Sequence, residues 1–96
     1  MRPSEVLPRH RELIRQKVLQ AGMANPRVFG SVVHGEDREQ SDFDLLVDPS
    51  PQTSLLDLAK LQLELESVMG IKVDLKTPNF LPDSFRDQVL AEAVPL

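Results

Sequence analysis

Residues 28–48 read VFGSVVHGEDREQSDFDLLVD, a stretch in which a glycine turn is followed by two carboxylates in an apolar setting. The Gly30-Ser31 pair ends a short apolar segment, and Asp42 lies eleven residues after Ser31. Asp42 and Asp44 alternate with apolar residues, namely Phe43, Leu45 and Val47. Because successive side chains of a strand point to opposite faces, residues 42–48 are predicted to form a strand with a buried apolar face and a face that carries both carboxylates.

Helical and extended patterns alternate along the rest of the chain. Apolar residues recur every three or four positions in 4–21 and 54–69, which predicts two amphipathic helices that end at Gly22 and Gly70. Ser4 is the candidate N-cap of the first helix. In chain order the predicted elements are helix 4–21, strand 27–30, helical turn 31–35, strand 42–48, helix 54–69, strand 71–75 and helix 83–94.

The lengths of the connections predict how the strands pair. Strands 42–48 and 71–75 are separated by a whole helix, which suits a right-handed parallel crossover. Strands 27–30 and 42–48 are joined by a short segment, which favours an antiparallel pair. The predicted fold class is therefore α/β of the α+β kind, with a mixed three- or four-stranded sheet covered by helices. Because 96 residues is the size of one small domain, residues 1–96 are expected to form a single domain.

Composition and charge narrow the class of function. A formal net charge of −4 lacks the basic surface that holds an extended nucleic acid, so we expect any bound nucleotide to be small and accompanied by a metal ion. The chain has no cysteine, which excludes disulfides and thiolate metal sites. No apolar run is long enough to span a membrane, and the N-terminus lacks the apolar segment of a secretory signal. A cytoplasmic protein is therefore expected.

Asp42 and Asp44 have the spacing of paired metal ligands. Side chains two residues apart on a strand share a face, with alpha carbons about 6.5 to 7 Å apart, so both carboxylates can converge on Mg²⁺. If strand 71–75 lies beside strand 42–48, Asp74 adds a third carboxylate, and a divalent ion would relieve the repulsion among the three. The alternative is a solvated strand edge, where carboxylates also alternate with apolar residues.

Gly30 and Ser31 have the character of a phosphate-binding turn. A glycine at the end of a strand lets the backbone approach a phosphate closely, and the free N–H groups of the following turn attract anions. Ser31 can cap this turn and offer its hydroxyl to the same phosphate. A plain glycine turn with a serine cap is the alternative, but a short connection joins this turn to the carboxylates in the order that a metal-nucleotide site requires.

The segment GSVVHGEDREQSDFDLLV resembles the motif of the minimal nucleotidyltransferases of the DNA polymerase beta superfamily. Its pattern is Gly-Ser, three residues, Gly, five residues, Ser-Asp-x-Asp-Leu and an apolar pair, and the resemblance extends from Arg27 to the end of the chain. It implies a polymerase-beta-type nucleotidyltransferase fold and transfer of a nucleoside monophosphate from a triphosphate, expected to be ATP. By position it implies that Gly30 and Ser31 hold the triphosphate and that Asp42 and Asp44 hold two Mg²⁺ ions.

The third carboxylate of this family lies on a later strand. Asp74 in IKVDLKT is the best match, as a metal ligand and as the group that receives the proton of the acceptor hydroxyl. Three other acidic residues are alternatives for this role: Asp48, Glu64 and Glu66.

Two positions depart from the pattern of many relatives. Val32 stands where they carry an arginine directly after Gly-Ser, and His34 is expected to be a surface residue of the turn rather than a catalytic one. Positive charge for the triphosphate must then come from elsewhere, and the candidates are Arg27, Arg38, Lys72 and Lys76. Lys72 and Lys76 share a face with Asp74, so they could instead neutralise it.

The resemblance also implies a class of acceptor. Minimal members of the family commonly act as antitoxins that adenylylate a tyrosine of a partner toxin with a HEPN domain. This chain has no tyrosine, so a tyrosine acceptor must lie on another molecule. Two alternatives stay open: a binding module that neutralises its partner by contact, favoured by Val32, and a stand-alone transferase for a small molecule, whose acceptor pocket would require a homo-oligomer.

Overall fold

The computed structural model describes residues 1–96, and its elements follow the predicted order. They are α1 (Pro3–Gln20), β1 (Ala24–Phe29), α2 (Ser31–His34), β2 (Phe43–Asp48), α3 (Leu55–Met69), β3 (Val73–Lys76), the 3₁₀ turn η1 (Pro78–Phe80), α4 (Asp83–Glu92) and β4 (Val94–Pro95). The two-residue strand β4 and the turn η1 were not predicted. None of the helices combines the length and the apolar character needed to cross a membrane.

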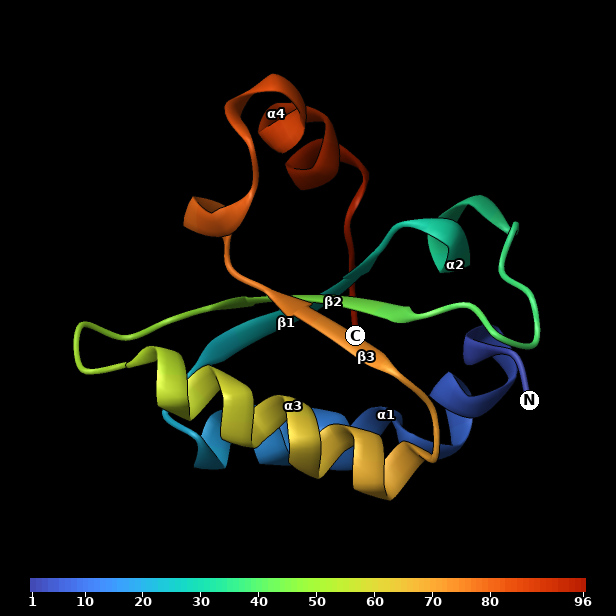
Figure 1. Cartoon of the computed structure of the whole chain (residues 1–96), viewed down its shortest axis with the longest axis horizontal. Helices are drawn as coiled ribbons and strands as arrows, with labels where there is room; N and C mark the ends of the chain where they lie inside the picture. Colours follow the sequence, from blue (N-terminus) through green and yellow to red (C-terminus); the bar gives the residue numbers. More distant parts are fainter.

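The four strands form one mixed sheet in the order β3-β2-β1-β4. β1 is antiparallel to both β2 and β4, whereas β2 and β3 are parallel, so both predicted pairings are confirmed. Helices α1 and α3 lie together on one side of the sheet, and α4 stands on the other (Figure 1). This second side is therefore only partly covered, and it is the side to which the carboxylates of β2 were predicted to point.

The core lies between the sheet and the helices α1 and α3. On β2, the side chains of Phe43, Leu45 and Val47 are fully buried in it, as the alternation predicts. Leu46 is also fully buried although it points to the opposite face and lies outside this core cluster. β2 contacts η1 on the way to α4, so the face that carries Asp44 is partly shielded from solvent rather than open.

The helix starts show which local signals the sequence carries. Ser54 and Asp57 form a capping box at α3: the Asp57 N–H donates to Ser54 Oγ at 3.1 Å, and the Ser54 N–H donates to Asp57 Oδ2 at 2.9 Å. The prediction of Ser4 as the cap of α1 is wrong. Arg2 is the N-cap and Pro3 takes the first helical position, which suits its fixed φ and its missing N–H.

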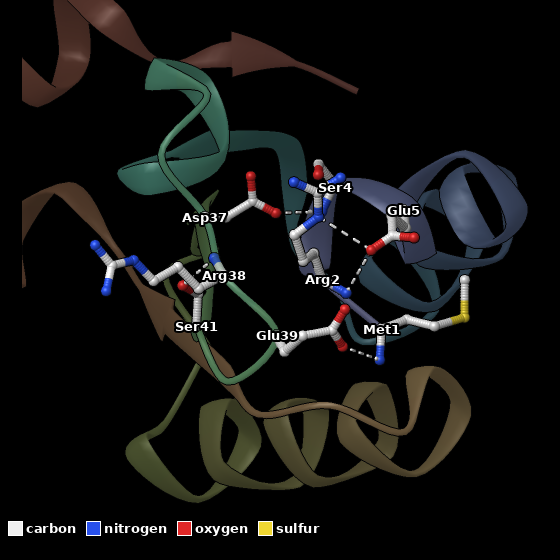
Figure 2. Close-up of polar contacts among 8 residues, drawn as sticks. All are labelled: Met1, Arg2, Ser4, Glu5, Asp37, Arg38, Glu39 and Ser41. Carbon is white, nitrogen blue, oxygen red and sulfur yellow. Dashed lines mark hydrogen bonds and ion pairs between the residues drawn. The ribbon is translucent and has the colours of Figure 1, made fainter.

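Asp37 fastens the α2–β2 loop, residues 35–42, to the start of α1. Its carboxylate is buried and accepts a hydrogen bond from the Ser4 N–H at 2.9 Å (Figure 2). Glu39 of the same loop pairs with the N-terminal amine at 3.1 Å. Burial favours a higher pKa for Asp37, but the hydrogen bonds from Ser4 and the charge of Arg2 outweigh it and hold the pKa below its usual value. The loop that leads into Asp42 is therefore held at two points.

Replacing Asp37 with alanine is expected to lower the free energy of unfolding by about 1–2 kcal/mol, because the Ser4 N–H loses its partner in a partly buried setting. Since the pKa of Asp37 is lowered by folding, its stabilisation is present above pH 4 or so and is lost as the pH falls through the folded pKa. Urea unfolding of Asp37→Ala and wild type should therefore differ less in acid than at pH 7. Glu36→Ala, at the exposed neighbouring position, is the control; an equal loss in both variants would contradict this role.

Candidate active site

Asp44 and Asp74 are brought together by the register of the two parallel strands. Asp44 on β2 is the direct neighbour of Asp74 on β3, on the side of the sheet opposite α1 and α3. Burial raises the pKa of Asp44 to about 6, and the negative charges of Asp74 and Asp42 and a hydrogen bond with Asp74 add to the rise. A pair of carboxylates in this conflict is the arrangement that a divalent cation relieves.

Gly30 lies directly against the carboxylate of Asp44. Phe29, the residue before it, pairs with Asp44 across β1 and β2. The backbone of Gly30 has φ +75° and ψ −146°, and a Cβ here would collide with Oδ2 of Asp44 and lie 2.9 Å from its Cγ. The missing side chain therefore allows the Gly-Ser turn to contact the acidic pair, which places the two halves of the opening motif side by side.

Ser31 opens the single helical turn α2, and Gly30 is its N-cap. The Gly30 carbonyl accepts hydrogen bonds from the N–H groups of Val33 and His34, at 3.1 and 3.3 Å. The N–H groups at the start of the turn have no partner within so short a helix. The predicted helical turn after Gly30 is therefore present, but the prediction that Ser31 caps it is wrong: Gly30 is the N-cap, and no side chain caps the turn.

Asp42 is less closely integrated than the other two carboxylates. It is exposed and precedes β2, which begins at Phe43, although its charge still acts on Asp44. No group of three or more His, Cys, Asp or Glu side chains is arranged so as to hold a metal ion by itself. The structure therefore brings Asp44 and Asp74 together and leaves Asp42 at the rim.

The other acidic residues considered for the third position have separate partners. Asp48 Oδ1 pairs with the guanidinium of Arg27 at 3.1 Å, at the far end of β2. The carboxylates of α3 lie on the covered side of the sheet: Glu66 accepts the Val73 N–H at 2.9 Å, and Glu64 pairs with Lys17 at 3.8 Å. Asp74 therefore remains the candidate.

Of the four candidate cations, only Lys76 contacts the acidic pair. Its Nζ lies 3.3 Å from Oδ1 of Asp74. Arg27 is engaged by Asp48, while Arg38 and Lys72 are exposed and form no ion pair. The expectation that a lysine of β3 neutralises Asp74 therefore holds for Lys76.

Comparison with known proteins decides the family. The family model for the polymerase beta nucleotidyltransferase matches residues 15–96. The chain belongs to this family. This nucleotidyltransferase is 37% identical over 89 residues to the protein adenylyltransferase MntA of Thermococcus cleftensis, covering 93% of this chain and 87% of the relative. A solved structure described as a minimal nucleotidyltransferase is 44% identical with a TM-score of 0.87, covering 97% of this chain and 95% of that chain.

A more distant likeness concerns the fold alone. A solved complex of a tri-AMPylated Shewanella oneidensis HEPN toxin with an MNT antitoxin matches with a TM-score of 0.60 at 18% identity, covering 88% of this chain and 69% of that chain. The family matches confirm the predicted superfamily, the polymerase-beta-type fold and the assignment as a nucleotidyltransferase.

The acidic pair of this nucleotidyltransferase fits a magnesium ion in its chemistry. Asp44 and Asp74 offer only oxygen donors, and their mutual repulsion is relieved by a cation. Mg²⁺ usually takes one or two carboxylates and completes its coordination with water and substrate phosphates, so a closed set of three protein ligands is not required.

A cavity of about 340 Å³ adjoins Gly30 between β1, α2 and α4 in this nucleotidyltransferase. Its lining residues are Phe29, Gly30, His34, Phe85, Gln88, Val89 and Glu92. His34 Nε2 lies 3.0 Å from Oε2 of Glu92, so the predicted surface residue of the turn is a link between α2 and α4. Val32, by contrast, packs against the core and offers no charge to a phosphate. The sequence did not indicate the cavity, because α4 is positioned by the short strand β4 that follows it.

Proposed function

We propose that this nucleotidyltransferase transfers AMP from ATP, with magnesium, to a tyrosine hydroxyl of a HEPN-domain partner and so acts as the antitoxin of that partner. The observation that carries the proposal is the pair Asp44 and Asp74 set against Gly30. The relative MntA is named a protein adenylyltransferase, and the fold recurs in a complex with an AMPylated HEPN toxin. The chain itself has no tyrosine to modify.

The residues of the site divide the work of in-line displacement. Gly30 and Ser31 hold the β- and γ-phosphates, which leave as pyrophosphate, through the N–H groups of the turn and the serine hydroxyl. Asp44 and Asp74 would hold the metal, with Asp42 at the rim as a further ligand. When bound, magnesium supplies charge neutralisation at the triphosphate and acidifies the acceptor hydroxyl. The acceptor oxygen bonds to the α-phosphorus, the bond to pyrophosphate breaks, and Asp74 receives the hydroxyl proton.

Replacing Asp74 with asparagine is expected to lower AMP transfer at least about a hundredfold, more than loss of a partner outside the ligand shell causes. The assay mixes the protein with ATP labelled at the α-phosphate, magnesium and a HEPN-domain partner, and follows label on that partner. Asp48→Asn is the matched control, because Asp48 pairs with Arg27 away from the acidic pair. Wild-type labelling by Asp74→Asn would contradict the assigned role.

The same mixture separates the proposal from the alternatives. Label on the partner that disappears when its acceptor tyrosine is changed to phenylalanine supports protein adenylylation. A tight complex that never becomes labelled would favour a binding module. Val32 favours this alternative, because it packs against the core and offers no charge to a phosphate. A labelled small molecule made without any partner, by a self-associated protein in light scattering, would favour the stand-alone transferase.

A further inference from the structure

Lys76 lies where it can affect the binding of both the metal ion and the triphosphate. It follows Asp74 by two residues on β3, so both side chains share the face of the acidic pair. Its Nζ lies 3.3 Å from Oδ1 of Asp74, and the exposed fractions of the two side chains are 42% and 39%. Its charge also reaches Asp44. The ammonium therefore stands where a cation bound to Asp74 would be.

A metal ion and this ammonium disfavour one another at Asp74. Each needs the oxygens of the same carboxylate, and two positive charges a few ångströms apart repel. Lysine has a flexible four-carbon stem that can move its charge, whereas the strand holds the carboxylate in place. Metal binding to Asp74 is thus expected to release Lys76 from its ion pair.

The ammonium of Lys76, once released, can bind the phosphates of the triphosphate. Triphosphates need positive partners, yet the residue after Gly-Ser is the packed Val32 and Arg27 is held by Asp48. Arg38 and Lys72 are exposed and form no ion pair. Among the four cations considered as partners of the triphosphate, only Lys76 already contacts the acidic pair.

We propose that Lys76 couples metal and nucleotide: it pairs with Asp74 in the absence of nucleotide and moves to the phosphates of the triphosphate when Asp74 binds the metal. The proposal rests on the nucleotidyltransferase function and adds a substrate-binding residue to it. Because coupling between two ligands is reciprocal, metal favours the nucleotide and nucleotide favours the metal through the same side chain. Lys76 thereby supplies part of the positive charge that many relatives obtain from an arginine at the position of Val32.

Lys76→Met, which keeps the length and removes the charge, should change two affinities in opposite directions. Mn²⁺ alone, followed by electron paramagnetic resonance on the full chain, should bind about threefold more tightly, as for loss of a partly exposed competing charge. A fluorescent non-hydrolysable ATP analogue at saturating Mg²⁺ should bind about threefold more weakly. Lys72→Met, on the same face but without an ion pair, is the matched control and should follow wild type.

Each outcome of these two titrations decides the assignment. Opposite changes in Lys76→Met with a neutral Lys72→Met support the coupling, because a merely structural defect would weaken both ligands. Unchanged affinities, or changes in the same direction, overturn it while leaving the proposed function intact. If wild type binds no Mn²⁺ at all, or Asp74→Asn binds it equally well, the metal site fails and the role of Lys76 is overturned with it.

Discussion

Asp44→Asn is expected to reduce AMP transfer about a thousandfold while making the metal-free protein more stable at neutral pH. The loss of activity follows from removing a charged oxygen ligand from the centre of the acidic pair, a larger defect than the roughly 10–100-fold caused by partners outside the ligand shell. The gain in stability follows from ending a like-charge conflict, because burial and the charges of Asp74 and Asp42 raise the pKa of Asp44 to about 6.

The sign of the stability effect depends on pH. A carboxyl group with an ordinary pKa of 3.8 that rises to about 6 on folding binds its proton more tightly in the folded state. Its favourable contribution is complete below pH 4 or so and is lost as the pH rises through about 6. Two pKa units correspond to about 3 kcal/mol, and we expect roughly half of this because the side chain is half-buried and partly screened by solvent.

Urea unfolding of wild type and Asp44→Asn with a chelator present measures this contribution. The two proteins should have similar free energies of unfolding near pH 4, and the variant should be more stable by about 1–2 kcal/mol at pH 7.5. Magnesium should then stabilise wild type more than the variant. Asp48→Asn, on the same strand, should retain transfer and show no such gain. If Asp44→Asn were less stable than wild type at pH 7.5, the inferred like-charge repulsion at Asp44 would be wrong.

The fold could be predicted wherever a pattern was long enough to have a period. The leucine stripe of 54–69 and the alternation around Asp44 located α3 and β2 to within a residue of their observed bounds. The pairing of strands followed from the lengths of their connections. β4 could not be found, because two residues have no period and their pairing with β1 is a tertiary contact. The burial of Leu46 could not be predicted either, because it depends on tertiary contacts over the face of β2 that also carries Asp44.

The site was predictable as a set of residues but not as an arrangement. The spacing of Gly30, Asp42 and Asp44 is written in the sequence, whereas the meeting of Asp44 with Asp74 depends on the register of β2 and β3. The role of Asp42 as a metal ligand stays a prediction, because β2 begins one residue later and leaves Asp42 exposed. The pairing of Arg27 with Asp48 could not be read either, because the strand pairing is irregular between residues 24 and 27.

Gly30→Ala is expected to abolish transfer and to lower the free energy of unfolding by about 2–4 kcal/mol. Two costs combine at this position. The backbone conformation, φ +75° with ψ −146°, lies in a region essentially restricted to glycine, and such strain costs about 1–3 kcal/mol. The added Cβ also collides with Oδ2 of Asp44, so the carboxylate must shift to make room. Displacement by as little as 1 Å at a reacting centre can cost about a hundredfold in rate.

Gly35→Ala separates these two costs, because Gly35 also has a positive φ, +68°, but an added Cβ there meets nothing within 4 Å. It ends the same helical turn in the ordinary left-handed region, so alanine should cost only about 1 kcal/mol and leave transfer nearly unchanged. Urea unfolding and α-labelled ATP transfer, measured on both variants, give the comparison. Binding of Mn²⁺ should weaken in Gly30→Ala alone, since only there is Asp44 displaced. Equal losses of metal binding in the two variants would mean that the turn, rather than its contact with Asp44, is what the site requires.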